Sequence, residues 1–336
     1  MNNQTTCTCP LCGRSAHSIA DAVPGYQEGR TYTICECEEC LASFAIPMMC
    51  DDSLYNCIYA NARYVPGYNR YYRYASEVIS QRRPLEYLSR QEETYWAVAR
   101  HLGKKKHEKD RLNILEIGCG MGYFTYAVAK AGFTITGVDI SRKAIDWARE
   151  HYGPYYACKT LLDLKSENAR YDLIIMNQSV EHCPDVHAFI SEALDLLSSE
   201  GELIITTPNK STFPDSKWGS DMQPVHLWWF GEEAMRYIAQ RHKCRIALMD
   251  FEPFYKDHVS IKTPNATICD YKPVFDATGA LLVHHALPPV RPVRRMLEQT
   301  GGLMVLRRIR AVLAGKDRWR GSRGPIIAAV LRRAGS

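Results

Sequence analysis

Four cysteines near the start of the chain have the spacing of a metal site. They form two C-x-x-C pairs, Cys9 with Cys12 and Cys37 with Cys40, separated by 24 residues. Each pair can direct two thiolates at one ion, and four thiolates are the ligands of a closed tetrahedral zinc site. The sequence therefore predicts a zinc ribbon in residues 1–50. We expect its zinc to be structural, because no coordination position stays open.

Other interpretations of the cysteines stay open. The two pairs could be reduced or redox-active dithiols, and ligation could shift to Cys7 and Cys35, which stand two residues before Cys9 and Cys37. The chain has 13 cysteines, eight of them before residue 58. Its first residues show neither a basic region nor an apolar run, so we expect no signal peptide and a cytoplasmic protein. Clustered thiols stay reduced there and favour a metal site.

A glycine-rich turn in the middle of the chain has the pattern of a cofactor site. In LEIGCGMGYF, residues 115–124, Gly118, Gly120 and Gly122 follow an apolar strand and precede a helix. Without a Cβ the backbone can approach a ligand closely, and the helix N-terminus offers N–H groups to a carboxylate. A dinucleotide fingerprint would need a glycine at Tyr123, so a nicotinamide cofactor is disfavoured.

A carboxylate follows the next expected strand. In GVDIS, Asp139 stands seventeen residues after Gly122, where it can accept both hydroxyls of a ribose. Each feature alone is a weak signal. The two occur in the right order and in the strand and helix context that a nucleoside site requires.

Four segments together resemble a known family. LEIGCGMGYF, GVDIS, YDLIIMNQSVEH and LLSSEGELIITTPN resemble the motifs of class I S-adenosylmethionine-dependent methyltransferases, above all the small-molecule branch with the ubiquinone-biosynthesis O-methyltransferases. The resemblance covers about residues 111–255. It implies that Glu116, Gly118 and Gly120 contact the methionine part of the cofactor, Asp139 the ribose and Ile140 the adenine. The cofactor-binding set we expect is Glu116, Gly118, Cys119, Gly120, Gly122, Tyr123, Asp139, Ile140, Leu161, Asn177 and Gln178.

Two histidines are candidates for an acid/base role. A methyl group on a sulfonium is already activated, so catalysis is mainly alignment, and a hydroxyl acceptor needs only a base for its proton. His182 and His226 both follow expected strands, and Glu181 could orient either histidine or the substrate. The alternatives are helix capping for His182 and aromatic packing beside Trp228 for His226.

The segment after the expected strand at residues 172–176 narrows the acceptor class. Methylation of nucleobase amines commonly uses Asn or Asp followed by Pro-Pro and an aromatic residue, whereas this segment reads NQSVEH. Methylation of nucleobase amines is therefore disfavoured, and the resemblance to O-methyltransferases implies methyl transfer to a hydroxyl, which we expect on a small molecule or a glycan intermediate. Two alternatives stay open: an RNA methyltransferase that binds RNA through the zinc ribbon and a basic tail, and a non-catalytic, zinc-dependent interaction protein.

Alternating strands and helices must position these residues. Apolar strands separated by helices predict a parallel sheet covered on both faces, with ligands beyond the carboxyl ends of its strands. The fold class is an α/β, Rossmann-like, doubly wound and mostly parallel seven-stranded sheet with a small N-terminal zinc ribbon. Strands are expected at residues 113–117, 134–138, 172–176, 201–207 and 244–251, and helices at 123–131, 141–151, 186–197 and 232–241.

Composition divides the chain into four parts. They are a zinc ribbon (1–50), a helical cap rich in Tyr and Arg (51–110), the cofactor-binding domain (111–255) and a C-terminal extension (256–336). In similar enzymes such a cap closes over the cofactor, and its tyrosines could hold a sugar or aromatic acceptor. Ordinary helix packing and stacking of RNA bases are the alternatives.

The C-terminal extension is strongly basic. Residues 291–336 hold twelve Lys or Arg and two acidic residues, whereas the whole chain has a net charge of +5. Residues 302–314 mix apolar residues with Arg307, Arg308 and Arg310. Such a helix could lie on an anionic membrane face, contact RNA or dock on a protein. We expect peripheral membrane contact before nucleic acid, and predict no oligomeric state.

Overall fold

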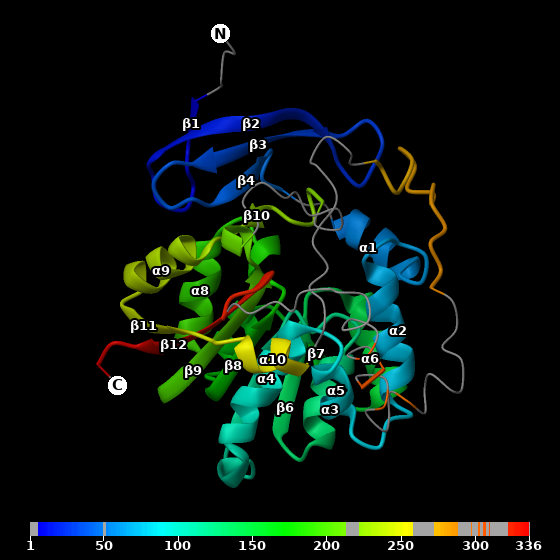
Figure 1. Ribbon diagram of the computed structural model, residues 1–336, viewed down its shortest axis with the longest axis vertical. Coiled ribbons are helices and arrows are strands. Elements are labelled where there is room, and N and C mark those ends of the chain that lie inside the picture. The colour runs from blue at the N-terminus through cyan, green and yellow to red at the C-terminus, as the bar shows by residue number, and fades with distance from the viewer. Residues whose placement is uncertain are drawn as a thin grey trace.

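The computed structural model describes residues 6–49, 52–212, 222–257, 272–287 and 322–335, with a few single positions between 297 and 309. A small antiparallel sheet lies at one end of the molecule and a large sheet flanked by helices forms the rest (Figure 1). The N-terminus lies beside the small sheet, and the last strand lies inside the large one.

The large sheet confirms the predicted fold class. Its seven strands, in spatial order, are β11 (Cys244–Leu248), β12 (Ile326–Arg333), β9 (Leu197–Pro208), β8 (Tyr171–Asn177), β5 (Asn113–Ile117), β6 (Thr134–Asp139) and β7 (Tyr156–Cys158). The neighbours from β9 to β7 are parallel, and β12 is antiparallel to both of its neighbours. Because strand order reverses at β5 and β8, a ligand cavity is expected beyond their carboxyl ends.

Helices cover both faces of this sheet. Alternate residues of a strand point to opposite faces, so Ile114 and Ile175 pack with α3 to α6, whereas Leu115 and Ile174 pack with α8 and α9. This two-sided burial explains why β5 and β8 are almost wholly apolar. The helices of the described residues are α1 (Asp52–Ala60), α2 (Tyr68–Val78), α3 (Pro84–Ser89), α4 (Glu93–Lys104), α5 (Tyr123–Lys130), α6 (Arg142–Tyr152), α7 (Leu161–Ser166), α8 (Val186–Asp195), α9 (Glu232–Arg241) and α10 (Glu252–Asp257), with short 3₁₀ turns η1 (Lys106–Glu108), η2 (Val180–His182) and η3 (Lys210–Thr212).

The last strand corrects the predicted extent of the cofactor-binding domain. Sequence reasoning placed residues 256–336 in a separate basic extension, but β12 inserts between β9 and β11. Ala329 is wholly buried there and pairs with Ile205 and Leu248. A continuous apolar run, IIAAVL, is typical of a buried strand, and the arginines that follow it masked this signal. The domain therefore needs both residues 113–248 and residues 326–333.

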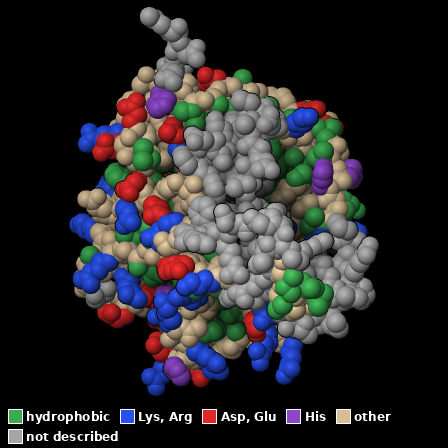
Figure 2. All heavy atoms as spheres, viewed as in Figure 1, with side chains coloured by type: hydrophobic (Ala, Val, Ile, Leu, Met, Phe, Trp, Pro, Cys, Tyr) green, Lys and Arg blue, Asp and Glu red, His purple; other side chains and the backbone are tan. Residues whose placement is uncertain are grey.

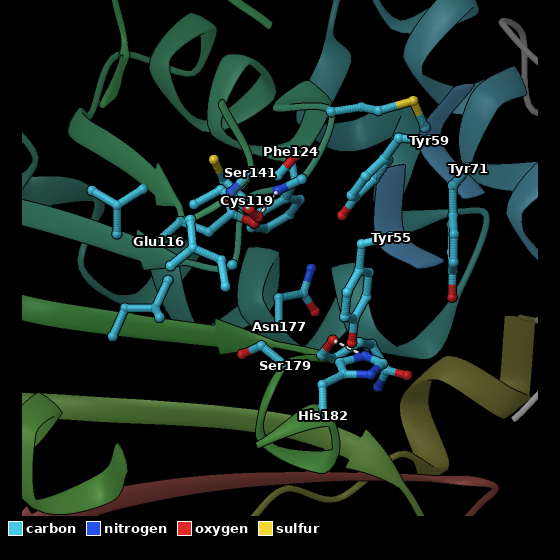
Figure 3. Close-up of a pocket in the computed structure, with 18 of the residues that line it drawn as sticks. Tyr55, Tyr59, Tyr71, Glu116, Cys119, Phe124, Ser141, Asn177, Ser179 and His182 are labelled. Carbon is cyan, nitrogen blue, oxygen red and sulfur yellow. Dashed lines mark hydrogen bonds between the residues drawn. The ribbon is translucent and has the colours of Figure 1, made fainter. Parts of the chain in front are cut away.

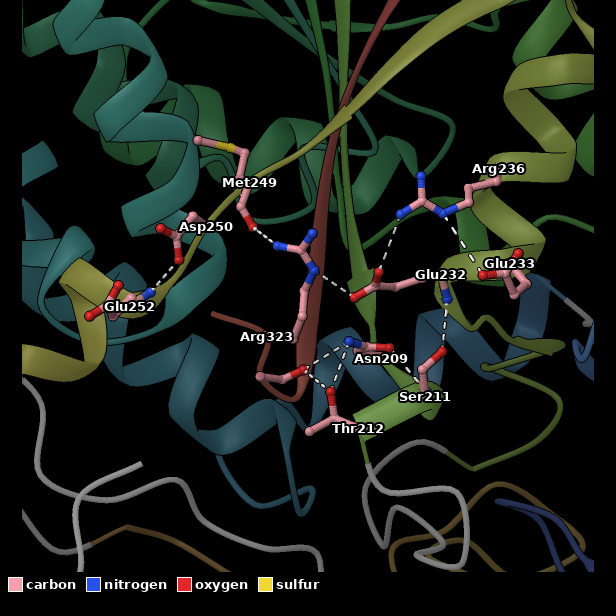
Figure 4. Close-up of polar contacts among 11 residues, drawn as sticks. Asn209, Ser211, Thr212, Glu232, Glu233, Arg236, Met249, Asp250, Glu252 and Arg323 are labelled. Carbon is pink, nitrogen blue, oxygen red and sulfur yellow. Dashed lines mark hydrogen bonds and ion pairs between the residues drawn. The ribbon is translucent and has the colours of Figure 1, made fainter. Parts of the chain in front are cut away.

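Polar contacts hold the approach to β12 in place. Arg323 forms an ion pair with Glu232 at 2.8 Å and donates to the carbonyl oxygen of Met249 at 3.1 Å (Figure 4). The side-chain amide of Asn209 donates to the carbonyl oxygen of Gly324 at 3.0 Å. These bonds join the C-terminal strand to the ends of β9 and β11.

The small sheet and its turns contain the four cysteines of the predicted zinc site, and we call residues 6–46 the zinc module after that prediction. The sheet contains β1 (Thr6–Thr8), β2 (Ser15–Pro24), β3 (Thr31–Cys37) and β4 (Ser43–Ile46), all antiparallel. Its fifth strand, β10 (Trp228–Trp229), comes from the other part of the chain and pairs with β4, directly beneath which it lies in Figure 1. Residues of the zinc module and of β8, β9 and α8 share one hydrophobic core, so the two parts form a continuous structure.

The part of the chain between β4 and β5 is helical, as expected for the cap. Residues 84–104 of the cap form two helices, α3 and α4, and α4 packs against β9 and β12. Ala75 and Val78 of α2 are buried in the core shared with α5 and β5. Helices α2 to α4 are therefore packed on one face of the large sheet, whereas Leu54 and Ile58 of α1 pack in a core with the small sheet.

The described surface carries mixed charges. On the face shown in Figure 2, Lys and Arg side chains gather along the edge opposite the zinc module, with acidic side chains among them. No helix of the described residues is long and apolar enough to cross a membrane. Most of residues 302–314, a segment that could contact a membrane, RNA or a protein, lies outside the described residues.

Candidate functional site

A large cavity lies at the carboxyl ends of β5, β6 and β8. Its volume is about 890 Å³, near the upper end of the range for small-molecule sites. Tyr55 and Tyr59 reach into it from one side, whereas Asn177, Ser179 and His182 lie on the other (Figure 3). The predicted residues that line it are Glu116, Gly118, Cys119, Gly120, Tyr123, Asp139, Ile140, Leu161, Asn177, Gln178, His182 and His226.

The glycine turn keeps space open beside the cavity. Gly118 and Gly120 have φ of +72° and +51°, a conformation that favours glycine. A Cβ on Gly120 would lie 3.2 Å from the hydroxyl of Tyr59. Gly122 differs, because it does not line the cavity and its Cβ would lie 2.5 Å from the ring of Tyr156. A side chain at Gly122 would collide with Tyr156, and this explains the glycine. The expected contact between Gly122 and the cofactor has no support in the cavity lining.

Asp139 joins the ends of two strands. Its carboxylate accepts hydrogen bonds from the backbone N–H of Gly120 at 2.9 Å and of Ser141 at 2.8 Å. Burial raises its pKa, while the bonds to Ser141 and Gly120 act in the opposite direction. These two N–H groups fix the carboxylate at the cavity wall, in a position to accept further hydrogen bonds from a ligand.

Glu116 is a buried carboxyl group at the same wall. It is 3% exposed and accepts a hydrogen bond from the hydroxyl of Thr125 on α5. Burial raises the pKa of Glu116 to about 8, so the unliganded chain holds it protonated at neutral pH. A cationic ligand in this cavity would favour the ionised carboxylate.

The loop after β8 presents polar atoms that have no hydrogen-bond partner within the described residues. They are Nε2 of Gln178 and the hydroxyl of Ser179, both buried. Gln178 has φ of +56°, which is unusual for a residue other than glycine and typical of functional loops. Asn177, just before it, accepts a hydrogen bond from Thr206 at 2.7 Å. Buried polar groups are normally satisfied, so these atoms fit a cavity that receives a polar ligand.

Ile140 and Leu161 are the predicted residues on the part of the cavity wall beyond Asp139. Ile140 is 67% exposed, so an apolar face is available next to Asp139. Leu161 lines the cavity as the first residue of α7. Asp163, two residues further on, accepts hydrogen bonds from the backbone N–H and the hydroxyl of Thr160, the N-cap residue of α7.

His182 is oriented by two backbone carbonyl groups. Its Nδ1 lies 2.6 Å from the oxygen of Val225, and its Nε2 lies 3.1 Å from the oxygen of Gln178. If Nδ1 donates its proton to Val225, Nε2 of the neutral ring carries a lone pair. A proton gained at Nε2 would then be donated to Gln178. Because a carbonyl oxygen only accepts, a neutral ring can bond to one of the two carbonyl groups, and Nε2 can meet an acceptor hydroxyl only when it is released from Gln178.

His226 is placed for a different role. Its ring centroid lies 4.8 Å from that of His182, with the rings nearly perpendicular. Burial, with a smaller effect from the guanidinium of Arg70, lowers the pKa of His226 to about 3. A group with such a pKa stays neutral near pH 7 and is a poor base. Of the two candidates the geometry favours His182.

Glu181 lies behind this pair. It is 0% exposed and does not line the cavity, although the ligand atoms of Glu181, His182 and His226 all lie within 4.8 Å of one another. Its backbone oxygen accepts a hydrogen bond from the N–H of Leu227 at 2.9 Å. Glu181 can thus act on the histidines and does not reach the cavity.

The acceptor side contains residues that the motifs did not assign. Tyr55, Tyr59, Tyr68 and Tyr71 of the cap line the cavity, with Arg70. The sequence named these tyrosines only as a group, and it gave no sign that Ser179 would have an unsatisfied hydroxyl. Contacts between segments far apart in the chain determine which residues of the cap face the site.

The four predicted zinc ligands come together. The sulfur atoms of Cys9, Cys12, Cys37 and Cys40 lie within 4.8 Å of one another, with 3.7 Å between Cys9 and Cys40 and 3.3 Å between Cys12 and Cys37. Thiolates about 2.3 Å from a tetrahedral zinc lie roughly 3.8 Å apart. The backbone N–H of Cys40 also points at the sulfur of Cys37, at 3.5 Å. Cys7 and Cys35 do not belong to this cluster, so the donor set fits zinc in the predicted register.

Part of the chain is similar to known proteins. Residues 87–247 match the model of a family described as a methyltransferase domain. The ubiquinone biosynthesis O-methyltransferase of Bartonella tribocorum is 34% identical over 107 residues, which cover 30% of this chain and 43% of that protein. The enzyme of the same name from Coxiella burnetii is 33% identical over 104 residues, covering 30% and 44%. The chain thus spans less than half the length of these curated relatives.

Solved structures include a SAM dependent methyltransferase from Archaeoglobus fulgidus, which is 16% identical with a TM-score of 0.42 and covers 71% of this chain and 94% of its own. Another is the magnesium protoporphyrin IX methyltransferase of Synechocystis, with 21% identity, a TM-score of 0.39 and coverage of 59% and 89%.

Proposed function

We propose, on the premise that residues 87–247 form a class I methyltransferase domain, that the chain transfers a methyl group from S-adenosylmethionine to a hydroxyl of a small molecule or glycan intermediate. The observation that carries the proposal is that Asp139 and His182, from the ends of different strands, line one cavity. One can bind a nucleoside and the other can accept a proton.

The first wall of the cavity would hold the cofactor. Asp139 is set to accept the ribose hydroxyls, Ile140 offers an apolar face to the adenine, and Gly118 and Gly120 leave space for the methionine part. When bound, the cofactor supplies a methyl group activated by the sulfonium charge. The chain then needs to align the acceptor and exclude water, which is catalysis by positioning.

The second wall would hold the acceptor. Nδ1–H of His182 donates to Val225. Nε2 would take the proton of the acceptor hydroxyl when that hydroxyl replaces the carbonyl oxygen of Gln178 as its neighbour. After the methylated product leaves, the N–H formed at Nε2 can donate to the carbonyl oxygen of Gln178. Tyr55 lies edge-on to His182, with ring centroids 6.4 Å apart, and offers a flat, partly polar surface to a sugar or an aromatic ring.

Zinc would be structural and held by Cys9, Cys12, Cys37 and Cys40. A four-thiolate site leaves no position for substrate, so zinc takes no part in methyl transfer. We place the chain in the cytoplasm, with its basic C-terminal segment as a contact to an anionic membrane.

Product analysis tests this function. The zinc-loaded chain is incubated with methyl-labelled cofactor and separate pools of RNA, lipid-linked glycans and small metabolites. We expect label in a glycan or metabolite pool, stable to conditions that cleave methyl esters, and at least about tenfold less with His182→Ala. Label confined to RNA would overturn the proposed acceptor class.

A further inference from the structure

One short segment joins the zinc module to the acceptor side of the cavity. This bracing segment, residues 222–230, contains His226 and lies between β4 and η2. Every residue of it is buried. One set of its hydrogen bonds joins it to the zinc module, and another set joins it to the loop that contains His182.

Toward the zinc module, the bracing segment continues the small sheet. Trp228 pairs with Phe44 and Trp229 with Ser43 across β10 and β4. The backbone N–H of Ala45 donates to the oxygen of Leu227 at 3.0 Å. The start of the segment is also bonded to the zinc module, because the backbone N–H of Tyr26 donates to the oxygen of Gln223 at 3.1 Å.

Toward the cavity, the same segment holds the loop that contains His182. The oxygen of Val225 lies 2.6 Å from Nδ1 of His182, and the N–H of Leu227 donates to the oxygen of Glu181 at 2.9 Å. The indole N–H of Trp228 donates to the oxygen of Cys183, also at 2.9 Å. The ring of Trp228 stacks on Phe230 and contacts Phe44, so it is fixed on both sides.

A buried lysine ties the end of the segment to the zinc ligands. Lys210 is 9% exposed and forms an ion pair with Glu36 of β3, the residue before Cys37. Its ammonium also donates at 3.0 Å to the oxygen of Leu41, the residue after Cys40. The backbone N–H of Lys210 donates to the oxygen of Phe230 at 2.9 Å. The turn that holds Cys37 and Cys40 is therefore linked to the bracing segment through one residue.

The cofactor side is held by different bonds. The N–H groups of Gly118 and Cys119 donate to the oxygen of Val138 at 2.9 and 3.0 Å, and Gly120 donates to Asp139. These are contacts within the large sheet and its own loops. A change at β4 can therefore reach the acceptor side and leave the cofactor side in place.

We propose that the zinc module is a positioning element of the acceptor site. Zinc held by the four cysteines would fix the turn of Cys37 and Cys40. β4 then holds β10, and the bracing segment holds His226 and the carbonyl group of Val225 that faces Nδ1 of His182. Lys210 is the positioning residue at this connection. The catalytic consequence rests on the proposed function, whereas the mechanical connection does not.

Zinc removal tests the connection in the full-length chain. Zinc is extracted with a chelator at neutral pH, its loss is measured by atomic absorption, and amide hydrogen exchange is followed by mass spectrometry. We expect exchange in residues 222–230 to accelerate at least about tenfold, together with residues 43–46, while residues 113–141 change less than about twofold. Unchanged exchange in 222–230 after complete zinc loss overturns the proposal.

If chelation unfolds the whole chain, zinc removal cannot test the connection. A variant that keeps the four cysteines tests it instead. Lys210→Met keeps the length of the side chain and removes its ion pair with Glu36. The matched control is Lys165→Met, which removes an exposed ion pair with Asp195 of 2.6 Å. We expect only Lys210→Met to accelerate exchange in 222–230, with calorimetric affinity for S-adenosylmethionine unchanged within about threefold. Equal exchange in the two variants contradicts the proposal.

The same samples separate this inference from the proposed function. If both hold, Lys210→Met lowers kcat about tenfold or more and leaves cofactor affinity intact. If no acceptor is methylated but exchange in 222–230 still depends on Lys210 and zinc, the proposed function fails and the connection stands. If kcat and exchange are both unchanged in Lys210→Met, the connection fails.

Discussion

The two walls of the cavity are built in different ways. The cofactor wall comes mainly from one continuous stretch, from Glu116 to Ser141, and its shape is set by backbone bonds such as that from Gly120 to Asp139. The acceptor wall combines α1, α2, η2 and residue His226, which are far apart in the chain. The first wall is a local structure, whereas the second depends on how separate layers pack.

This difference implies that the walls respond separately to perturbation. Changes in the first should alter binding of the cofactor, and changes in the second should alter turnover or acceptor affinity. A variant that moves both parameters together would show that the walls are one cooperative unit.

The largest effect is expected at His182. His182→Ala removes the base and both of its carbonyl contacts, so kcat should fall about 10²- to 10⁴-fold. Cofactor affinity, measured by calorimetry, should stay within about threefold of wild type. His226→Ala is the matched control and should reduce kcat less, because burial holds its pKa near 3. The reverse order of the two variants would assign the base to His226.

Asp139 gives the next largest effect, on the other wall. Asp139→Ala removes a carboxylate that orients the glycine turn and accepts hydroxyl groups, so the affinity for S-adenosylmethionine should fall about 10²-fold, at about 1.5 kcal/mol for each of two bonds to a charged group. Asp139→Asn should lose less. Equal affinities for wild type and Asp139→Ala would exclude a ribose at this position.

The same contrast explains what the sequence could predict. The glycine turn, Asp139 and the zinc cysteines are contiguous or regularly spaced, so residue type and spacing identified them. The bond between His182 and Val225 joins two loops 43 residues apart, and no local pattern reports it. Residues 326–333 were misassigned because their arginines suggested a tail, although burial between β9 and β11 decides their conformation. Gly122 was placed by the motif, but contact with Tyr156 explains it better.

A smaller effect is expected from pH at the cofactor wall. Burial raises the pKa of Glu116 to about 8, so a cationic ligand must displace its proton below that pH. Affinity for S-adenosylmethionine should rise between about pH 6 and 8, by at most tenfold per unit, and level off above. Calorimetry in buffers of different ionisation enthalpy should show proton release at pH 7. Glu116→Gln should abolish the slope, and a slope that persists in it would point to another group.

The raised pKa of Glu116 makes the stability of the unliganded chain fall with rising pH, whereas it makes cofactor affinity rise. Because the pKa of Glu116 is higher in the folded state than in the unfolded state, folding is favoured below about pH 4.5 and loses this contribution as pH rises through 8. The contribution is at most about 5 kcal/mol at about 1.4 kcal/mol per unit. Denaturant titrations of wild type and Glu116→Gln across this range would measure it.

The smallest effect is expected from the cap. Tyr55→Phe keeps the ring beside His182 and removes only a hydroxyl, so the acceptor KM should rise about threefold with kcat nearly unchanged. Tyr55→Ala also removes the ring and should raise KM more. A fall in kcat for Tyr55→Phe would show that this hydroxyl takes part in proton transfer.

The most direct measurement is a calorimetric titration of the zinc-loaded, full-length chain with S-adenosylmethionine, its demethylated product and NAD in parallel. If the turn after β5 and the carboxylate after β6 hold a sulfonium nucleoside, the first two ligands bind with one site per chain and compete, and NAD gives no heat. Binding of NAD, or the absence of binding by S-adenosylmethionine, would contradict the account.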